Sequence, residues 1–195
     1  MSVPELYLAS TSPRRHLLLQ QAGVVFEPCE PGEEYAGEDP HAGDPPRQLA
    51  IERARRKALG AVCHDPRVPV LGVDTTVDVD GDELGKALDR AEAEAMLRRL
   101  LGRTHLVHTA HCLVVPESGI RHEEVVSATV VGGEPTAAEL HAYLASDDWR
   151  GKAGAYGIQD ATQKFLRVVE GEFDTVMGLH RAAVVRLLAR CRGRA

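Results

Sequence analysis

The feature that most constrains this chain of 195 residues is an apolar run near its start that passes directly into a polar segment. Leu6 to Ala9 is apolar, and Ser10-Thr11-Ser12-Pro13-Arg14-Arg15 follows it, ahead of His16-Leu17-Leu18-Leu19. Ser12 is a residue type that caps helices, and Pro13 suits a first helical turn, where a missing N–H costs nothing. The segment therefore predicts a strand that leads straight into a helix, with Ser12 as the N-cap.

The start of that helix has the chemistry of an anion site. A helix N-terminus offers unpaired backbone N–H groups and a partial positive charge. The hydroxyl groups of Ser10 and Ser12 and the guanidinium groups of Arg14 and Arg15 add donors that match phosphate oxygens. We interpret the segment as a phosphate-binding turn; the alternative is an ordinary capped helix with two solvated arginines.

Strand and helix signals alternate along the rest of the chain, which is typical of the α/β class. Asp89 and Thr136 each precede a Glu by three residues, the capping-box pattern of a helix start. With 44% hydrophobic residues and no linker or internal repeat, we expect one domain over residues 1–195. Strands are predicted at 24–28, 68–79, 105–115, 123–131, 165–169 and 173–177, with hairpin turns at Asp80-Gly81 and 170–172, and helices at 47–62, 89–102, from 136 and from about 181.

Composition excludes several classes of protein. The net charge is −6 and the basic residues are dispersed, so no nucleic-acid partner is expected. No apolar run has membrane-spanning length and no signal peptide is recognisable, so we expect a cytoplasmic protein without a membrane partner. The four cysteines, Cys29, Cys63, Cys112 and Cys191, lie far apart in the sequence, which favours reduced and mostly buried thiols over a disulfide framework or zinc site.

Asp74 stands inside an apolar strand pattern, between Val70-Leu71-Gly72-Val73 and Val77. Burying a carboxylate there is costly unless it has a partner. Mg²⁺ typically uses one or two carboxylates together with substrate phosphates. Asp74 could hold such a metal, or orient and deprotonate a water for attack on phosphorus. The alternative is a structural Asp at the end of a strand, bonded to the backbone.

Two further segments carry polar groups beside glycines. Lys86 ends Leu84-Gly85-Lys86, and from there it could reach toward Asp74 and a phosphate. Three glycines in the stretch 151–159 allow close backbone approach to a ligand, and Gln159 at its end carries both a donor and an acceptor for a base edge. Taken alone, each segment has a structural alternative: Lys86 could be a surface lysine, and the stretch 151–159 could be a tight turn packed on the core.

Two other features point to packing rather than chemistry. His105, His108 and His111 recur every third residue, but on a strand His108 faces the opposite side from the other two, so the three cannot converge on a metal. Trp149 is expected to pack under the glycine loop rather than to stack on a base.

Taken in order, four segments resemble the Maf family of nucleoside triphosphate pyrophosphatases, once named for inhibition of septum formation. The segments are Leu8-Ala9-Ser10-Thr11-Ser12-Pro13-Arg14-Arg15, Leu71-Gly72-Val73-Asp74-Thr75, Leu84-Gly85-Lys86 and Lys152-Ala153-Gly154-Ala155-Tyr156-Gly157-Ile158-Gln159. The resemblance runs from about Leu6 to Leu188. It implies an elongated α/β fold with a central mixed sheet flanked by helices, and two lobes around a nucleotide cleft.

The resemblance also implies an activity and a set of site residues. It implies hydrolysis of a nucleoside triphosphate to the monophosphate and pyrophosphate with Mg²⁺ or Mn²⁺, and a homodimer is the candidate assembly. Asp74 matches the catalytic acid and a metal ligand; the second ligand maps onto Glu34, with Glu33 as the alternative because the spacing leaves one residue of ambiguity. The positions that match phosphate or substrate contacts are Ser10, Arg14, Arg15, Lys57, Lys86 and Gln159.

The Gly-Ile-Gln form of the last segment, with Arg15 and Lys86, is similar to the branch of the family that hydrolyses dTTP and UTP. The chain departs from the family pattern at Val73, at Ala87, at Asp160 to Gln163, where the family has a glycine-rich continuation, and at His180. Because the change after Gln159 borders the base pocket, a different base preference such as 7-methyl-GTP is one alternative. A non-catalytic nucleotide-binding regulator of cell division is the other.

Overall fold

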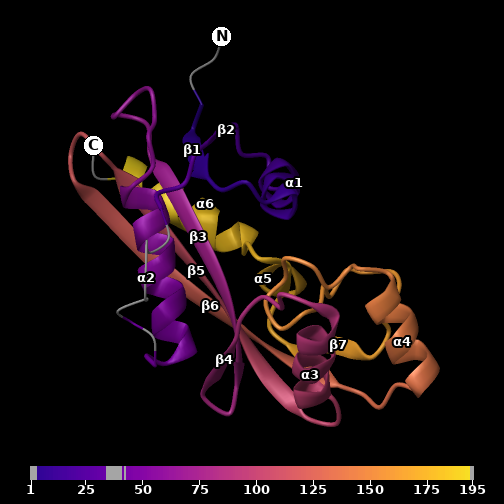
Figure 1. Ribbon diagram of the computed structural model, residues 1–195. Helices are drawn as coiled ribbons and strands as arrows, with labels where there is room; N and C mark the ends of the chain where they lie inside the picture. Colours follow the sequence, from indigo (N-terminus) through magenta and orange to yellow (C-terminus); the bar gives the residue numbers. More distant parts are fainter. Residues whose placement is uncertain (1–3, 34–40, 42, 194–195) are drawn as a thin grey trace.

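The computed structural model describes residues 4–33, 41 and 43–193, and two long strands run through it from end to end (Figure 1). They are β5 (Thr104–Val115) and β6 (Ile120–Gly132), which pair antiparallel along their length. In the seven-stranded sheet β2, β1, β3, β5, β6 and β7 follow one another, and β4 pairs with β3. β1 is parallel to its neighbours β2 and β3 and the other pairs are antiparallel, so the sheet is mixed. The shorter strands are β1 (Leu6–Ala9), β2 (Phe26–Cys29), β3 (Val70–Val79), β4 (Asp82–Leu84) and β7 (Leu166–Glu170).

The helices alternate with strands in the first half of the chain and cover both faces of the sheet (Figure 1). This arrangement confirms the predicted α/β class with a central mixed sheet. None of the helices in the described part of the chain is long and apolar enough to cross a membrane. Their bounds are α1 (Pro13–Gln21), α2 (Pro46–Leu59), α3 (Arg90–Leu100), α4 (Ala137–Ala145), α5 (Phe173–Met177) and α6 (Arg181–Arg192).

The buried side chains form separate clusters at the two ends of the long strands. One lies among β1, α1 and α6, where Leu8, Leu19 and Leu187 are fully buried. The other lies under α3 and α4 and contains Tyr143 and Trp149. Trp149 belongs to the same cluster as Ala155, Tyr156 and Ile158 of the glycine-rich stretch 151–159, as predicted. The molecule therefore has two lobes along one sheet, with α1 and α6 on the first and α3, α4 and β7 on the second (Figure 1).

Helix α2 packs very close to β3 because Gly72 faces it. A Cβ atom at Gly72 would lie 2.1 Å from the carbonyl oxygen of Ala54 and 2.6 Å from the backbone nitrogen of Ala58. Glycine is the one residue type that fits such an approach. The contact fixes Lys57 on α2 relative to Asp74, which follows Gly72 on β3.

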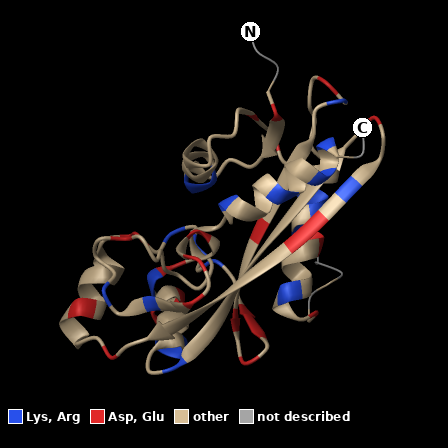
Figure 2. Cartoon of the chain, turned by 180° about the vertical axis from the view of Figure 1, so that it is seen from behind, with Lys and Arg blue, Asp and Glu red and all other residues tan. Residues whose placement is uncertain are grey.

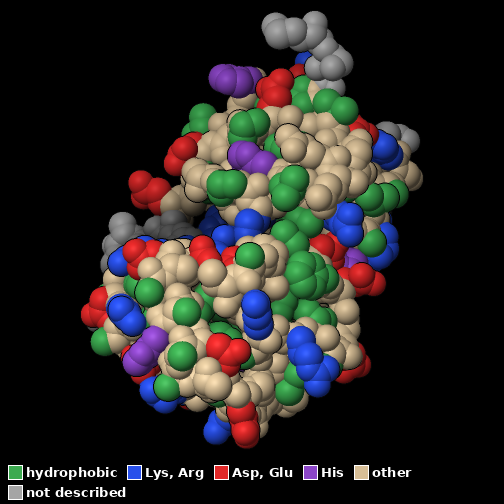
Figure 3. Space-filling view, turned by 90° about the vertical axis from the view of Figure 1, so that its right-hand side faces the viewer, with side chains coloured by type: hydrophobic (Ala, Val, Ile, Leu, Met, Phe, Trp, Pro, Cys, Tyr) green, Lys and Arg blue, Asp and Glu red, His purple; other side chains and the backbone are tan. Residues whose placement is uncertain are grey.

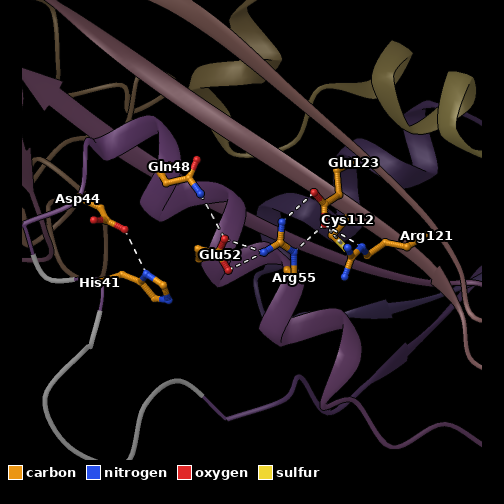
Figure 4. A network of polar contacts seen from close by, with 8 residues as sticks. All are labelled: His41, Asp44, Gln48, Glu52, Arg55, Cys112, Arg121 and Glu123. Atoms are coloured by element: carbon orange, nitrogen blue, oxygen red, sulfur yellow. Dashed lines mark hydrogen bonds and ion pairs between the residues drawn. The ribbon is translucent and has the colours of Figure 1, made fainter.

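A network of charged side chains also ties α2 to the sheet (Figure 4). The Arg55 guanidinium donates to both carboxylate oxygens of Glu52 at 2.6 and 2.7 Å and to those of Glu123 on β6 at 2.7 and 3.0 Å. The hydrogen bonds from Arg55 lower the pKa of Glu123. A bidentate guanidinium–carboxylate pair has fixed geometry, so Arg55 restricts the rotation of α2 about its axis.

The prediction of a strand at 173–177 is wrong, because these residues form α5. β7 ends at Glu170 and pairs with β6, so no hairpin forms at 170–172. Gly178 ends the short helix with φ of 109°, and its N–H donates to the carbonyl of Asp174 at 3.1 Å. A left-handed residue after the last turn is a common way to end a helix, and glycine is suited to it.

The predicted caps are confirmed in part. Thr136 forms a complete capping box with Glu139. Asp89 accepts from the Glu92 N–H, but the Glu92 carboxylate accepts from the N–H of Leu88 instead of closing the box. Ser12 occupies the N-cap position of α1 but its side chain makes no capping bond, so the predicted Ser12 cap is wrong in that respect.

The thiols also differ from expectation. All four cysteines are free, as predicted, but only Cys112 is buried; the other three are partly exposed. Cys29 and Cys63, 34 positions apart in sequence, have sulfur atoms 3.2 Å apart. They are close in space although distant in sequence, because β2 and the segment that follows α2 meet beside β1.

Candidate active site

A cavity of about 380 Å³ lies between the two lobes and is lined by residues of both. Figure 3 shows basic side chains gathered in the hollow where the two halves of the molecule meet. The lining includes Ser10, Arg14, Arg15, Lys57, Asp74, Lys86 and Gln159. The structure thus brings seven of the predicted site residues, from positions 10 to 159, to one hollow.

The turn between β1 and α1 forms one end of this cavity. The Ser10 hydroxyl accepts from the backbone N–H of Ser12 at 3.2 Å and from Arg15 Nη1 at 3.2 Å. Arg15 also donates through Nε to the Gly178 carbonyl at 2.9 Å, which links the turn to the end of α5. Figure 2 shows the basic residues of α1 on the side of the helix that faces the other lobe. The local hydrogen bonds therefore fix the loop at the helix N-terminus, and the basic residues line the cavity.

Asp74 and Lys57 form a buried ion pair in the wall of the cavity. Lys57 Nζ lies 2.5 Å from Asp74 Oδ1, and each side chain is 11% exposed. A carboxylate inside a strand is costly unless paired, so the lysine explains how Asp74 is accommodated at this position. Only Oδ1 takes part in the pair, which leaves Oδ2 as the oxygen for a water or a cation.

Lys86 reaches the cavity from the turn after β4. Its backbone pairs with Ala153, and the N–H of Gly154 donates to the carbonyls of Leu84 and Gly85 at 3.2 and 2.9 Å. These bonds hold Lys86 against the glycine loop. The exposed side chain of Lys86 lies on the cavity lining, on the lobe opposite Arg14.

The glycine loop, residues 151–160, forms the other end of the cavity. Gln159 is exposed, and its Nε2 donates to Asp160 Oδ1 at 3.2 Å. Asp160 accepts from Lys152 Nζ at 2.5 and 2.6 Å and from the Tyr143 hydroxyl at 3.0 Å. The sequence did not predict these contacts of Lys152, Tyr143 and Asp160; of the three, Lys152 lines the cavity and the other two lie behind the loop. The signal in the sequence that points to Asp160 is its departure from the glycine-rich continuation of the family pattern.

The described residues contain no group of three or more His, Cys, Asp or Glu side chains placed to hold a metal ion. Glu33 is exposed, and Glu34, the preferred second ligand in the sequence prediction, lies outside the described residues. Asp74 is therefore the one predicted ligand that the structure places in the cavity wall. A single carboxylate completed by substrate phosphates and water is an arrangement that Mg²⁺ commonly accepts.

The three histidines of β5 do not converge, as predicted. His105 contacts the Tyr156 hydroxyl at 2.8 Å, His108 contacts Ser127 and Asp78, and the backbone N–H of His180 donates to His111 Nε2 at 3.0 Å. Burial lowers the pKa of both His105 and His111 to about 4. His105 and His111 are therefore buried neutral groups at pH 7.

One cavity in a mixed sheet combines a helix N-terminus, arginines, lysines and a buried carboxylate, a set of groups whose chemistry favours a phosphorylated ligand. Comparison with known proteins agrees: the family model for Maf-like proteins matches residues 5–191. The chain belongs to the Maf family.

Curated relatives cover nearly the whole chain. A dTTP/UTP pyrophosphatase of Symbiobacterium thermophilum is 41% identical over 190 residues, which covers 95% of this chain and 93% of the relative. Proteins of the same name from Bordetella avium and Thermus thermophilus are each 42% identical, covering 96% and 95% of this chain and 95% and 94% of the relatives.

Proposed function

We propose that this chain hydrolyses dTTP and UTP to the nucleoside monophosphate and pyrophosphate. The observation that carries the proposal is the placement of the Asp74–Lys57 pair in the same cavity as a basic helix N-terminus and the Gln159 loop. The names of the relatives, dTTP/UTP pyrophosphatase, support the same reaction and substrates.

The triphosphate would lie at the end of the cavity formed by the β1–α1 turn. The backbone N–H groups of α1 and the side chains of Ser10 and Arg14 supply donors there, and Lys86 supplies a charge from the opposite lobe. Arg15 is bonded to Ser10 and Gly178, so it shapes the turn as well as adding charge. Catalysis by positioning and charge stabilisation is typical of phosphoryl transfer.

Asp74 would act on the water. Its carboxylate is held by Lys57, so its second oxygen has a fixed position from which to orient a water molecule and accept its proton. The water oxygen bonds to the α-phosphorus while the bond from that phosphorus to the α–β bridging oxygen breaks, so pyrophosphate leaves with the bridging oxygen. Lys57 stands beside the reacting groups and stabilises the negative charge that develops on the phosphoryl oxygens.

A divalent cation, Mg²⁺ or Mn²⁺, fits the donor set. Asp74 would hold it together with phosphate oxygens, and Glu34, or Glu33 as the alternative, is the proposed second ligand. When bound, such an ion neutralises phosphate charge and lowers the pKa of a coordinated water.

The base would lie against the glycine loop. The Gln159 amide carries a donor and an acceptor, which match O4 and N3–H of thymine or uracil. A base with the reverse pattern would leave polar groups of the site unpaired, which disfavours its binding.

The proposal is tested by incubating the purified protein and Mg²⁺ with each common nucleoside triphosphate and identifying the products by ion-exchange chromatography. We expect monophosphate and pyrophosphate, with UTP and dTTP turned over fastest. Reaction in ¹⁸O-labelled water shows which phosphorus is attacked, since the label enters either the monophosphate or the pyrophosphate. Release of orthophosphate as the first product would overturn the proposal.

A further inference from the structure

Asp160 is the centre of a closed set of contacts at the end of the cavity where the base would lie. Lys152 Nζ lies 2.5 and 2.6 Å from its two oxygens, and the Lys152 and Asp160 side chains are only 12% and 7% exposed. This pair joins the first and last parts of the glycine loop. A buried pair of this kind contributes definite geometry more reliably than stability.

Two further contacts fix the carboxylate from below the loop. The Tyr143 hydroxyl donates to Asp160 Oδ2 at 3.0 Å and accepts from the backbone N–H of Gly157 at 3.2 Å. A Cβ atom at Gly157 would lie 2.5 Å from both Asp160 oxygens, so the carboxylate packs directly against the loop backbone. Asp160 is therefore held from several sides and has little freedom to move.

The position of Asp160 determines which way the amide of Gln159 points. Nε2 of Gln159 lies 3.2 Å from Asp160 Oδ1. Rotating the amide by half a turn would place its carbonyl oxygen against the carboxylate oxygen, two acceptors with no proton between them. The carboxylate thus favours one amide orientation, in which Oε1 is the end left to accept a hydrogen bond from a ligand.

We propose that Asp160 is a positioning residue for base selection, which sets the Gln159 amide in the orientation that accepts uracil and thymine and rejects cytosine. This inference rests on the proposed hydrolysis of dTTP and UTP and adds a residue to it. Uracil and thymine offer a donor at N3 and an acceptor at O4, whereas cytosine offers an acceptor at N3 and a donor at N4. An amide with fixed oxygen and nitrogen positions matches only one of these patterns.

The chemistry also explains why a charged residue serves this purpose. An Asn at 160 could donate or accept, so it would leave both orientations of Gln159 satisfied. The carboxylate only accepts, and Lys152 compensates its charge. We therefore expect the selectivity to depend on the charge at position 160.

The test uses Asp160→Asn and the double variant Lys152→Met with Asp160→Asn, which removes both charges so that no unpaired ammonium remains. The kcat/KM values for UTP and CTP are measured for each, with circular dichroism and thermal melting to verify folding. We expect the UTP:CTP ratio to fall about 10-fold, the discrimination that one well-placed hydrogen-bonding pair commonly provides. Asp148→Asn is the matched control, because Asp148 bonds Thr162 at 2.6 Å on the same lobe and is expected to leave the ratio unchanged.

The outcomes separate this inference from the proposed function. An equal fall in kcat/KM for UTP and CTP in both variants would overturn the role of Asp160 and leave the hydrolysis intact. A wild-type protein that releases pyrophosphate from UTP and CTP equally well would overturn the proposed base preference and this inference together. A selective loss for UTP in both variants that is absent in Asp148→Asn supports the inference.

Discussion

The two ends of the cavity use their charged groups in opposite ways. At the phosphate end, Arg14 of the β1–α1 turn and Lys86 from the opposite lobe line the cavity, and neither takes part in an ion pair within the described residues. At the glycine loop, the cation of Lys152 is bound to Asp160. The first end is suited to attract any polyphosphate, because charge attraction does not depend on the base. The second end is electrically balanced, so hydrogen-bond pattern decides what it accepts.

This comparison predicts that a change at the phosphate end affects all nucleotides alike. Asp74→Asn should lower kcat by at least about 100-fold, since the amide neither accepts a proton nor holds a cation as a carboxylate does. Binding of a non-hydrolysable nucleotide analogue should persist, which isothermal titration calorimetry measures.

The control for this variant is Asp78→Asn on the same strand, where the amide oxygen can still accept from the N–H of Gly81. Turnover of Asp74→Asn equal to that of the wild type would remove Asp74 from the mechanism. A loss confined to UTP would contradict the separation of the two ends.

The next prediction concerns the base end. Gln159→Ala should lower kcat/KM for UTP about 10-fold more than for CTP, because it removes the group that matches uracil. The comparison of the two substrates in one assay is the measurement, with the exposed Gln48→Ala on α2 as control. A uniform fall on every nucleotide would mean that Gln159 braces the loop and does not read the base.

Whether the partners in a contact are close or distant in the sequence explains which parts of the site the sequence could predict. The turn from Ser10 to Arg15 is contiguous, and Asp74 stood out as a carboxylate among apolar residues, so both were found from local pattern. Lys57 was indicated only by the family resemblance, because a lysine on a polar helix side shows no sign that its partner is on another element. The Lys152–Asp160 pair depends on the closure of a loop, which spacing alone does not reveal.

The fold shows the same limit. The β-rich run 68–79 and its turn at Asp80-Gly81 predict a hairpin, which β3 and β4 confirm, and the strands predicted at 105–115 and 123–131 are confirmed by β5 and β6. The sequence predicts a strand at Phe173–Met177, but five residues are too few to distinguish the period of a strand from that of a helix. Two features stabilise its helical conformation. Gly178 ends the helix in the left-handed region, and the backbone N–H of Arg181, in the next helix, donates to Asp174 Oδ2 at 3.0 Å.

The two lobes should lose stability together as the pH falls, because each contains a buried neutral histidine. His105 in one lobe and His111 in the other have pKa values lowered to about 4 by burial, against 6.5 in the unfolded chain. Between these values the unfolded state binds more protons, so the free energy of unfolding decreases as pH falls from about 6.5 toward 4.

The free energy of unfolding, measured with urea, should be lower at pH 5.5 than at pH 7.5. Each histidine should account for about 1 kcal/mol of this decrease. His105→Phe and His111→Phe lose hydrogen bonds at both pH values, so the difference between the two pH values isolates the titration. An undiminished difference in either variant would contradict the burial of that histidine as a neutral group.

The smallest expected effect belongs to Ser12, which stands at a helix start but does not act as a side-chain cap. Replacing a bonded Ser or Thr cap by Ala typically costs about 1 kcal/mol. Ser12→Ala should therefore change the free energy of unfolding by less than about 0.5 kcal/mol, whereas Thr136→Ala, which breaks a complete capping box, should cost about 1 kcal/mol. Urea denaturation of both variants provides the comparison.

Because Ser12 lines the phosphate end of the cavity, any effect of Ser12→Ala on activity should appear as a raised KM shared by UTP and CTP. A stability loss in Ser12→Ala as large as that in Thr136→Ala would mean that the Ser12 hydroxyl caps α1 in solution.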